Sequence, residues 1–357
     1  MRKTRDTNIE LLKIVCALMV LTYHVINTLV PVEAFSMPKQ FLVWSFFWGG
    51  GRIAVNVFVI ISSWYLCDKT FTSKRILSTW ISTLIYSAIV GGYFAITLGK
   101  IEIFTFHLLP ISTNVIWFMR AYILMLLMTP VLNYLLEMPQ LKNFLIILFA
   151  IFSVYKTLYP GNVLDIGDWE VFLFIYLITG YIKRNKQRFI FKKRTFLILF
   201  LLAYFTNILW YIFYYQIINV LPFLTKFGYG RYMFNIYVNN VQCMLGGFAL
   251  FGFFKSIHIS KSKLSNLISW FSDGTLGVYI LLAMNSPEGY LWWIDLLKVR
   301  DWIYGNNLLP KIYLLIIILF LFTVCIDHVR AFAVSRFMRI KAVARLCNAF
   351  DRFYASK

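Results

Sequence analysis

The stretch KIVCALMVLTYH, residues 13–24, has the composition of a membrane-spanning helix but carries an ionisable residue at each end. Ten uncharged residues separate Lys13 from His24. On an α-helix this spacing corresponds to roughly three turns, so both side chains leave the same face, roughly 16 Å apart along the axis. They cannot contact each other, so either something else joins them or their alignment on one face is chance.

The composition of the whole chain predicts a membrane protein with many spans. The 357 residues are 60% hydrophobic and 19% aromatic, and only 14% are charged. The apolar runs are long enough to cross a hydrocarbon core of about 30 Å, whereas strands of a soluble core are far shorter. The sequence therefore predicts an all-α integral membrane protein. Its ten candidate spans are 8–31, 43–67, 76–98, 115–136, 143–159, 168–182, 196–216, 234–254, 267–284 and 311–328.

The net charge of +20 reflects the expected topology and not a nucleic-acid partner. Most of the 35 basic residues fall in segments that are cytoplasmic if the N-terminus is inside, as the positive-inside rule requires. We therefore predict a bundle of about ten helices with both termini cytoplasmic. One polytopic domain, 1–328, is followed by a basic amphipathic cytoplasmic tail, 329–357, which we expect to lie on the leaflet surface.

Four polar residues form a stripe along the first span. Glu10 precedes Lys13 by three residues and Asn27 follows His24 by three, so all four share one face. Lys13 could simply snorkel to the headgroups with Glu10 as its partner, and His24 could hydrogen-bond to a neighbouring helix. In the functional alternative, the cation near the cytoplasmic end suits a phosphate, and a neutral imidazole can accept a proton from a hydroxyl. A long ligand with a phosphorylated head and a reactive end would join the two, and acyl-coenzyme A has that shape.

The second span adds polar residues to an apolar run, GGGRIAVNVFVIISSWYL at residues 49–66. Its glycines allow a helix or a ligand to approach closely, and Ser62 and Ser63 favour helix packing. Arg52 and Asn56 are more suggestive, because a guanidinium at the outer mouth can hydrogen-bond a sugar or a carboxylate. Both are candidate substrate-binding residues.

Several segments, taken in order, resemble the integral-membrane acyltransferase-3 family. NIELLKIVCALMVLTYH resembles its opening helix, in which a basic residue precedes an essential histidine, and GGRIAVNVFVIISSWYL resembles its second helix. Later helices are matched by VIWFMRAYILMLLMTPVLN, FLFIYLITGYIKRN and LGVYILL. The similarity covers essentially the whole chain.

The resemblance implies a membrane-bound O-acyltransferase, most often an O-acetyltransferase, in a bacterial plasma membrane. Such an enzyme moves an acyl group from acyl-coenzyme A, such as acetyl-coenzyme A, to a hydroxyl of a cell-surface polysaccharide or its lipid-linked precursor. His24 then takes the position of the catalytic histidine, acting as general base. Lys13, with Glu10 beside it, takes the basic position that faces the donor.

Other positions match the family less completely. Lys74 and Arg75 supply charge where the family often carries an Arg-x-x-Arg pair, but Ser78 stands three residues after Arg75. Lys74 and Arg75 are assigned to binding of the acyl donor. Leu282 stands where close relatives carry a histidine.

The third matched segment supplies three further candidates for the acceptor sugar, Trp117, Arg120 and Tyr122. Arg120 could equally pair with an acid or snorkel outward. Tryptophans near the expected outer side could stack on sugar rings, but anchoring at the membrane interface is the preferred interpretation for Trp292, Trp293 and Trp302. The remaining histidines fall in loops or at span ends and are expected to be incidental: His107, His258 and His328.

Other chemistries leave signatures that this sequence lacks. It has no G-x-S-x-G elbow, no aspartate five residues after His24, no P-loop and no cluster of metal ligands, so we expect neither a metal nor a permanently bound cofactor. The expected partners are the lipid bilayer, the acyl donor, a glycan or lipid-linked glycan, and polysaccharide-synthesis machinery. The main rival is a transporter or flippase of a lipid-linked glycan, in which the stripe is a substrate or proton path. A family member that senses and does not catalyse, or one that transfers a larger acyl group such as succinyl, also stays open.

Overall fold

The fold is known from a computed structural model, which describes most of the chain. The described residues are 6–29, 50–113, 115–160, 167–185, 192–231, 237–260, 263–284, 291–303 and 307–355. Among them helices predominate and no β-strand is formed, which confirms the all-α prediction. Within these ranges six stretches are long and apolar enough to cross a membrane, so the chain is a membrane protein. They are Thr7–Asn27, Ser73–Leu98, Trp117–Leu135, Leu141–Leu158, Lys193–Val220 and Pro310–Phe337.

The other predicted spans correspond to shorter helices. Gly51–Leu66 and Val241–Ser256 are apolar but shorter than a full span, and the first residues predicted for these two spans lie outside the described part. The span predicted at 267–284 is interrupted at Gly274, where one helix ends and another begins.

Two compact units make up the chain, and each is described by itself. The first consists of Met1–Asp68 and Val131–Ser272, and the second of Lys69–Pro130 and Asp273–Lys357. One boundary between the two units falls at Pro130, inside the helix Trp117–Leu135, where the proline removes a backbone hydrogen bond.

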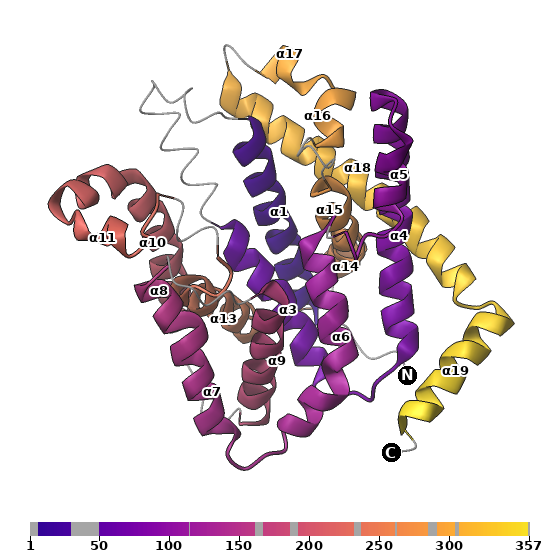
Figure 1. Cartoon of the computed structure of the whole chain (residues 1–357), viewed down its shortest axis with the longest axis horizontal. Coiled ribbons are helices and arrows are strands. Elements are labelled where there is room, and N and C mark those ends of the chain that lie inside the picture. Colours follow the sequence, from indigo (N-terminus) through magenta and orange to yellow (C-terminus); the bar gives the residue numbers. More distant parts are fainter. Residues whose placement is uncertain are drawn as a thin grey trace. The chain divides into compact units, whose positions relative to one another are not determined.

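The first unit is organised around α3 (Gly51–Leu66), which contacts α1, α9 and α13 (Figure 1). Glycines permit this close packing: a Cβ on Gly51 would lie 2.6 Å from the ring of Tyr23, and one on Gly247 would lie 3.0 Å from Asn56 Cβ. α10 lies along α13, and α7 contacts α9. The other helices of this unit are α1 (Thr7–Leu29), α7 (Leu141–Phe149), π-helix η2 (Ala150–Tyr155), α8 (Lys156–Leu158), α9 (Asp168–Arg184), α10 (Lys193–Val220), α11 (Phe223–Lys226), α13 (Val241–Ser256) and α14 (Lys263–Asp273).

The second unit is built on α4 (Ser73–Leu98) and α18 (Leu308–Phe337), which contact each other and α15 (Thr275–Leu282). α4 ends at Gly99, whose φ of 66° is the left-handed conformation that glycine adopts without strain. α18 is followed by a turn and by α19, which contacts α4 (Figure 1). The remaining helices are α5 (Ile101–His107), α6 (Trp117–Leu135, to Pro130), α16 (Trp292–Leu296), α17 (Val299–Ile303) and α19 (Lys341–Ala355).

Two of the tryptophans predicted to anchor at the interface are instead part of the core of the second unit. Trp292 is 8% exposed and Trp293 is completely buried. Their indole nitrogens donate to the carbonyl oxygens of Leu281 and Leu282, at 2.7 and 3.2 Å. A buried indole needs such a partner for its N–H, and here the open carbonyls at the end of α15 provide it. The interfacial interpretation was therefore wrong for this pair.

The last span is also longer than predicted. α18 continues from Leu308 to Phe337, past the end expected at 328, and α19 follows after residues 338–340. The polar residues that suggested an end include Asp327 and Arg330, which are three positions apart and form an ion pair within the helix. Neutralisation inside the helix explains why the apolar segment is not interrupted there.

His107, expected to be incidental, is completely buried where α5 packs against α4. Ser87 Oγ donates its proton to the carbonyl oxygen of His107 at 2.6 Å. Ser87 Oγ also lies 3.3 Å from His107 Nδ1. Nδ1–H must therefore be the donor in that second contact, which leaves Nε2 buried without a partner. Burial lowers the pKa of His107 from 6.5 to about 4.

Thermal stability should therefore depend on this histidine at mildly acidic pH. Between about pH 6.5 and 4 the unfolded chain binds a proton that folded His107 excludes, so the folded state loses on the order of 1 kcal/mol per pH unit as the pH falls. Melting temperatures of purified protein measured between pH 7.5 and 4.5 should decrease more steeply for the wild type than for His107→Gln. Parallel curves would show that this residue does not set the acid sensitivity.

Candidate active site

The polar stripe of the first span begins in the first turn of α1. Glu10 is 7% exposed, and Lys13 Nζ lies 3.1 Å from both of its carboxylate oxygens. Ser272 of α14 also donates a hydrogen bond to Glu10 Oε2. A carboxylate in the first turn interacts favourably with the helix dipole, and the cation three residues later balances its charge. Lys13 is thus paired with Glu10, and its contact with a ligand stays a prediction.

His24 lies further along α1, the helix that packs against α3. Its side chain is half-buried, and the ring of Tyr23 meets it edge-on at 5.4 Å between centroids. Arg52, at the start of α3, is close enough to act on His24 electrostatically, and Asp168 of α9 is near Arg52 in turn. The first unit therefore brings together an imidazole, which can accept a proton, and a guanidinium, which can stabilise a developing oxyanion.

The two asparagines predicted to contact substrate have different surroundings. Asn27, one turn after His24, is exposed. Asn56 is completely buried: its Nδ2 donates to the carbonyl oxygen of Val238 at 2.7 Å, while its Oδ1 has no hydrogen-bond partner. Asn56 therefore links α3 to the segment before α13, and its contact with a substrate stays a prediction.

The three candidates on α6 belong to the second unit. Arg120 is exposed and Trp117 is half-buried. Tyr122 stacks on Phe118, with 5.9 Å between ring centroids, and Phe118 in turn lies 4.2 Å from the ring of Tyr279. Tyr122 is thus part of an aromatic cluster between α6 and α15, and contact of these three side chains with a substrate stays a prediction.

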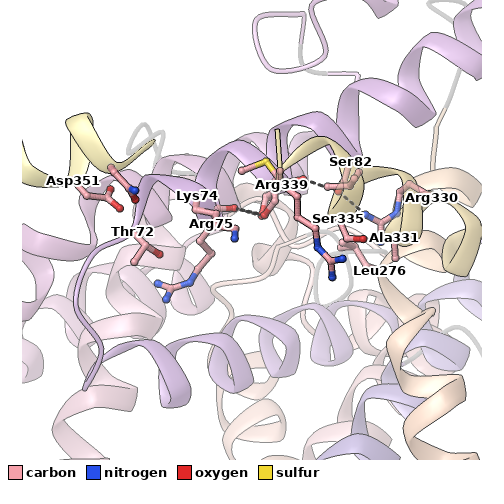
Figure 2. A pocket seen from close by; sticks show the side chains of 15 residues that line it. Thr72, Lys74, Arg75, Ser82, Leu276, Arg330, Ala331, Ser335, Arg339 and Asp351 are labelled. Atoms are coloured by element: carbon pink, nitrogen blue, oxygen red, sulfur yellow. Dashed lines mark hydrogen bonds between the residues drawn. The ribbon is translucent and has the colours of Figure 1, made fainter. Parts of the chain in front are cut away.

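A pocket of about 730 Å³ in the second unit contains the two residues assigned to the donor (Figure 2). Lys74 and Arg75 line it from the first turn of α4, and Arg330 and Arg339 line it from α18 and the turn that follows. Figure 2 shows these side chains along one side of α4, with Asp351 of α19 at one end of the row and Arg330 at the other. Hydroxyl groups complete the lining, from Thr72, Ser78, Thr79, Ser82 and Ser335.

Positive charge in this pocket exceeds negative charge. Arg330 is paired with Asp327, and the carboxylate of Asp351 accepts a hydrogen bond at 2.7 Å from the backbone N–H of Ser73 at the start of α4. Among the described residues no carboxylate pairs with the other three cations, Lys74, Arg75 and Arg339. The hydroxyls of Ser78, Thr79, Ser82 and Ser335 donate to helix carbonyl oxygens, so the cations are the groups left to bind a ligand. Several cations around one cavity are suited to an anion with several oxygens, such as a phosphate group.

Comparison with known protein families gives a match that extends over most of the chain. Residues 6–330 match the sequence profile of the acyltransferase-3 family, described as an acyltransferase domain. The protein belongs to the acyltransferase-3 family. No curated protein and no solved structure matches the chain significantly. The membership confirms the resemblance of the helix sequences and identifies the protein as a membrane acyltransferase.

The acyltransferase has pocket residues that the sequence did not reveal. Arg330 and Arg339 were counted as part of a tail, because they follow the predicted end of the last span. One local signal was available: Asp327 and Arg330 stand three positions apart on an apolar helix, the same spacing that singled out Glu10 and Lys13. Nothing in the sequence indicates that they lie beside α4.

Proposed function

We propose that this acyltransferase is an O-acyltransferase, in the simplest case an O-acetyltransferase, acting on a sugar of a bacterial cell-surface polysaccharide or its lipid-linked precursor. The single observation that carries the proposal is the family match over residues 6–330. Acyl-coenzyme A is the donor substrate, and no cofactor is permanently bound.

In this proposal His24 is the general base. It accepts the proton of the sugar hydroxyl while the hydroxyl oxygen attacks the thioester carbonyl, and the carbon–sulfur bond breaks with release of coenzyme A. Arg52 supports this role, because a guanidinium beside the imidazole can stabilise the negative charge that develops on the carbonyl oxygen. A neutral imidazole is also compatible with the half-buried position of His24 on an apolar helix.

The donor's phosphates are proposed to bind in the basic pocket, which is the cavity lined by Lys74, Arg75, Arg330 and Arg339. The charge of Lys74, Arg75 and Arg339, which has no carboxylate partner among the described residues, supports this assignment. Lys13, with Glu10, keeps the donor-binding role predicted from the sequence, which stays a prediction. Its pairing with Glu10 implies that ligand binding must compete for the Lys13 ammonium.

The acceptor sugar is proposed to contact Arg52, Asn56 and Asn27, together with residues of α6. Arg120 and Asn27 have exposed side chains, which suits contact with a hydrated sugar. The α6 candidates are Trp117, Arg120 and Tyr122. The glycan, the lipid bilayer and polysaccharide-synthesis machinery are the expected partners.

The proposed topology is a bundle of about ten helices in the bacterial inner membrane, with both termini cytoplasmic. The distribution of the 35 basic residues supports this orientation. The catalytic domain was predicted to end at residue 328, but that boundary falls inside α18. Because Arg330 and Arg339 line the pocket, we propose that the domain includes part of the predicted tail. The amphipathic, basic character of α19 supports a position at the cytoplasmic surface.

Purified protein with radiolabelled acetyl-coenzyme A and a crude envelope glycan fraction tests the proposal. Incorporation of label into glycan, with release of free coenzyme A, is the expected result. A protein that moves lipid-linked glycan across vesicle membranes without binding or consuming acetyl-coenzyme A would instead be a transporter.

A further inference from the structure

Arg330 differs from the other cations of the basic pocket because it is held in place. Its Nε and Nη2 donate to the two carboxylate oxygens of Asp327, at 2.6 and 3.0 Å. Its Nη1 donates to Ser82 Oγ on α4. This is a bidentate pair, in which the planar guanidinium has one orientation. Each terminal nitrogen keeps a second N–H, and Arg330 lines the cavity.

Asp327 is itself confined from several sides. It is completely buried, and the hydroxyl of Tyr86 on α4 donates to its Oδ1 at 2.7 Å. Gly277 of α15 lies so close that a Cβ there would be 2.6 Å from Asp327 Oδ1. Both oxygens of the carboxylate therefore have partners, and the side chain is enclosed by packed residues.

A buried ion pair of this kind is weak evidence for a role in stability alone. Desolvation of two charges offsets most of their attraction, and apolar residues of the same volume often stabilise a protein equally well. What the pair does provide is a guanidinium whose position is set before a ligand arrives. Such preorganisation strengthens binding, because less side-chain entropy is lost. Lys74, by contrast, is exposed at the start of α4.

We infer that Arg330 binds a phosphate of the acyl donor, and that Asp327 and Tyr86 are positioning residues that hold its guanidinium toward the pocket. The inference rests on the proposed function, which makes acyl-coenzyme A the occupant of this pocket. Arg330 adds a fork of N–H donors that matches phosphate geometry, which a lysine ammonium cannot supply.

The test measures the dissociation constant of coenzyme A for purified full-length variants. The double variant Asp327→Asn/Arg330→Gln removes both charges together, so no unpaired buried charge is left to unfold the protein. We expect its affinity to be about 10–50-fold weaker, in the range for loss of a charge-assisted contact. Tyr86→Phe should weaken binding about 2–5-fold, because it removes one hydrogen bond to Asp327 and no contact with the ligand.

The signature of positioning is non-additivity. Tyr86→Phe should have no further effect on affinity in the Asp327→Asn/Arg330→Gln background, because the hydroxyl then has no guanidinium to position. Arg345→Gln, which alters an exposed α19 residue that does not line the pocket, is the charge control and should bind normally. Melting temperatures verify that each variant is folded.

The outcomes separate the inference from the proposed function. Wild-type protein that binds no coenzyme A would overturn the donor assignment and the inference with it. Normal wild-type binding with an unchanged dissociation constant in the folded double variant would overturn the inference alone. An additive effect of Tyr86→Phe in the double-variant background would overturn the positioning role.

Discussion

Replacing His24 with alanine is expected to lower the rate of acyl transfer by about 10²–10⁴-fold, the range typical of a lost general base. Without the imidazole the attacking hydroxyl must lose its proton to water, or carry it into the transition state. The side chain is only half-buried, so its truncation leaves a smaller defect than a core substitution would. The measurement is transfer of label from acetyl-coenzyme A to glycan at saturating donor, so that kcat is compared and not affinity.

Two comparisons make this result specific to the imidazole of His24. His258→Ala removes an exposed histidine of the same unit and should retain wild-type activity. Coenzyme A binding by His24→Ala should stay within a few-fold of the wild type, which shows an intact donor site. If His24→Ala transferred label at the wild-type rate, another residue would have to be the base, and the stripe on α1 would become a structural feature or a transport path.

The sequence predicted the helices well because their signal is local. Long apolar runs must form helices in a membrane, since every backbone N–H and C=O needs a partner within the segment. The π-helical turn η2 at Ala150–Tyr155 has no comparable signature. The end of α18 was misplaced because Asp327 and Arg330 look like the polar end of a span. Only the structure shows that they pair with each other and with α4.

The site was predictable only where its residues share one helix. The stripe from Glu10 to Asn27 follows from the 3.6-residue period, and the structure shows the Glu10–Lys13 pair expected from that spacing. The contact of Tyr86 with Asp327 joins positions 241 residues apart in the chain. The burial of Trp293 also depends on packing between helices, because its indole N–H needs the carbonyl oxygen of Leu282 left open at the end of α15. Such contacts arise from packing, and no periodicity in the sequence encodes them.

Neutralising Lys74 and Arg75 together, as Lys74→Gln/Arg75→Gln, is expected to raise KM for acetyl-coenzyme A by at least about 10²-fold. Each cation can give a phosphate one charge-assisted contact, and each such contact contributes about 1.5–3 kcal/mol. Because the phosphates are remote from the reacting thioester, they are bound equally in ground and transition states, so kcat should change little. Initial rates over a wide range of donor concentration separate the two constants.

A matched control variant has the same net charge as Lys74→Gln/Arg75→Gln. Lys341→Gln/Arg345→Gln also removes two positive charges from the second unit, at exposed α19 positions that do not line the pocket, and should leave KM unchanged. Salt supplies a second criterion, since screening weakens charge–charge contacts. KM of the wild type should therefore rise between 0.05 and 0.5 M salt, on the order of several-fold, and that of Lys74→Gln/Arg75→Gln much less. Equal rises in KM for both double variants would mean that overall charge attracts the donor, and that this pocket is not where its phosphates bind.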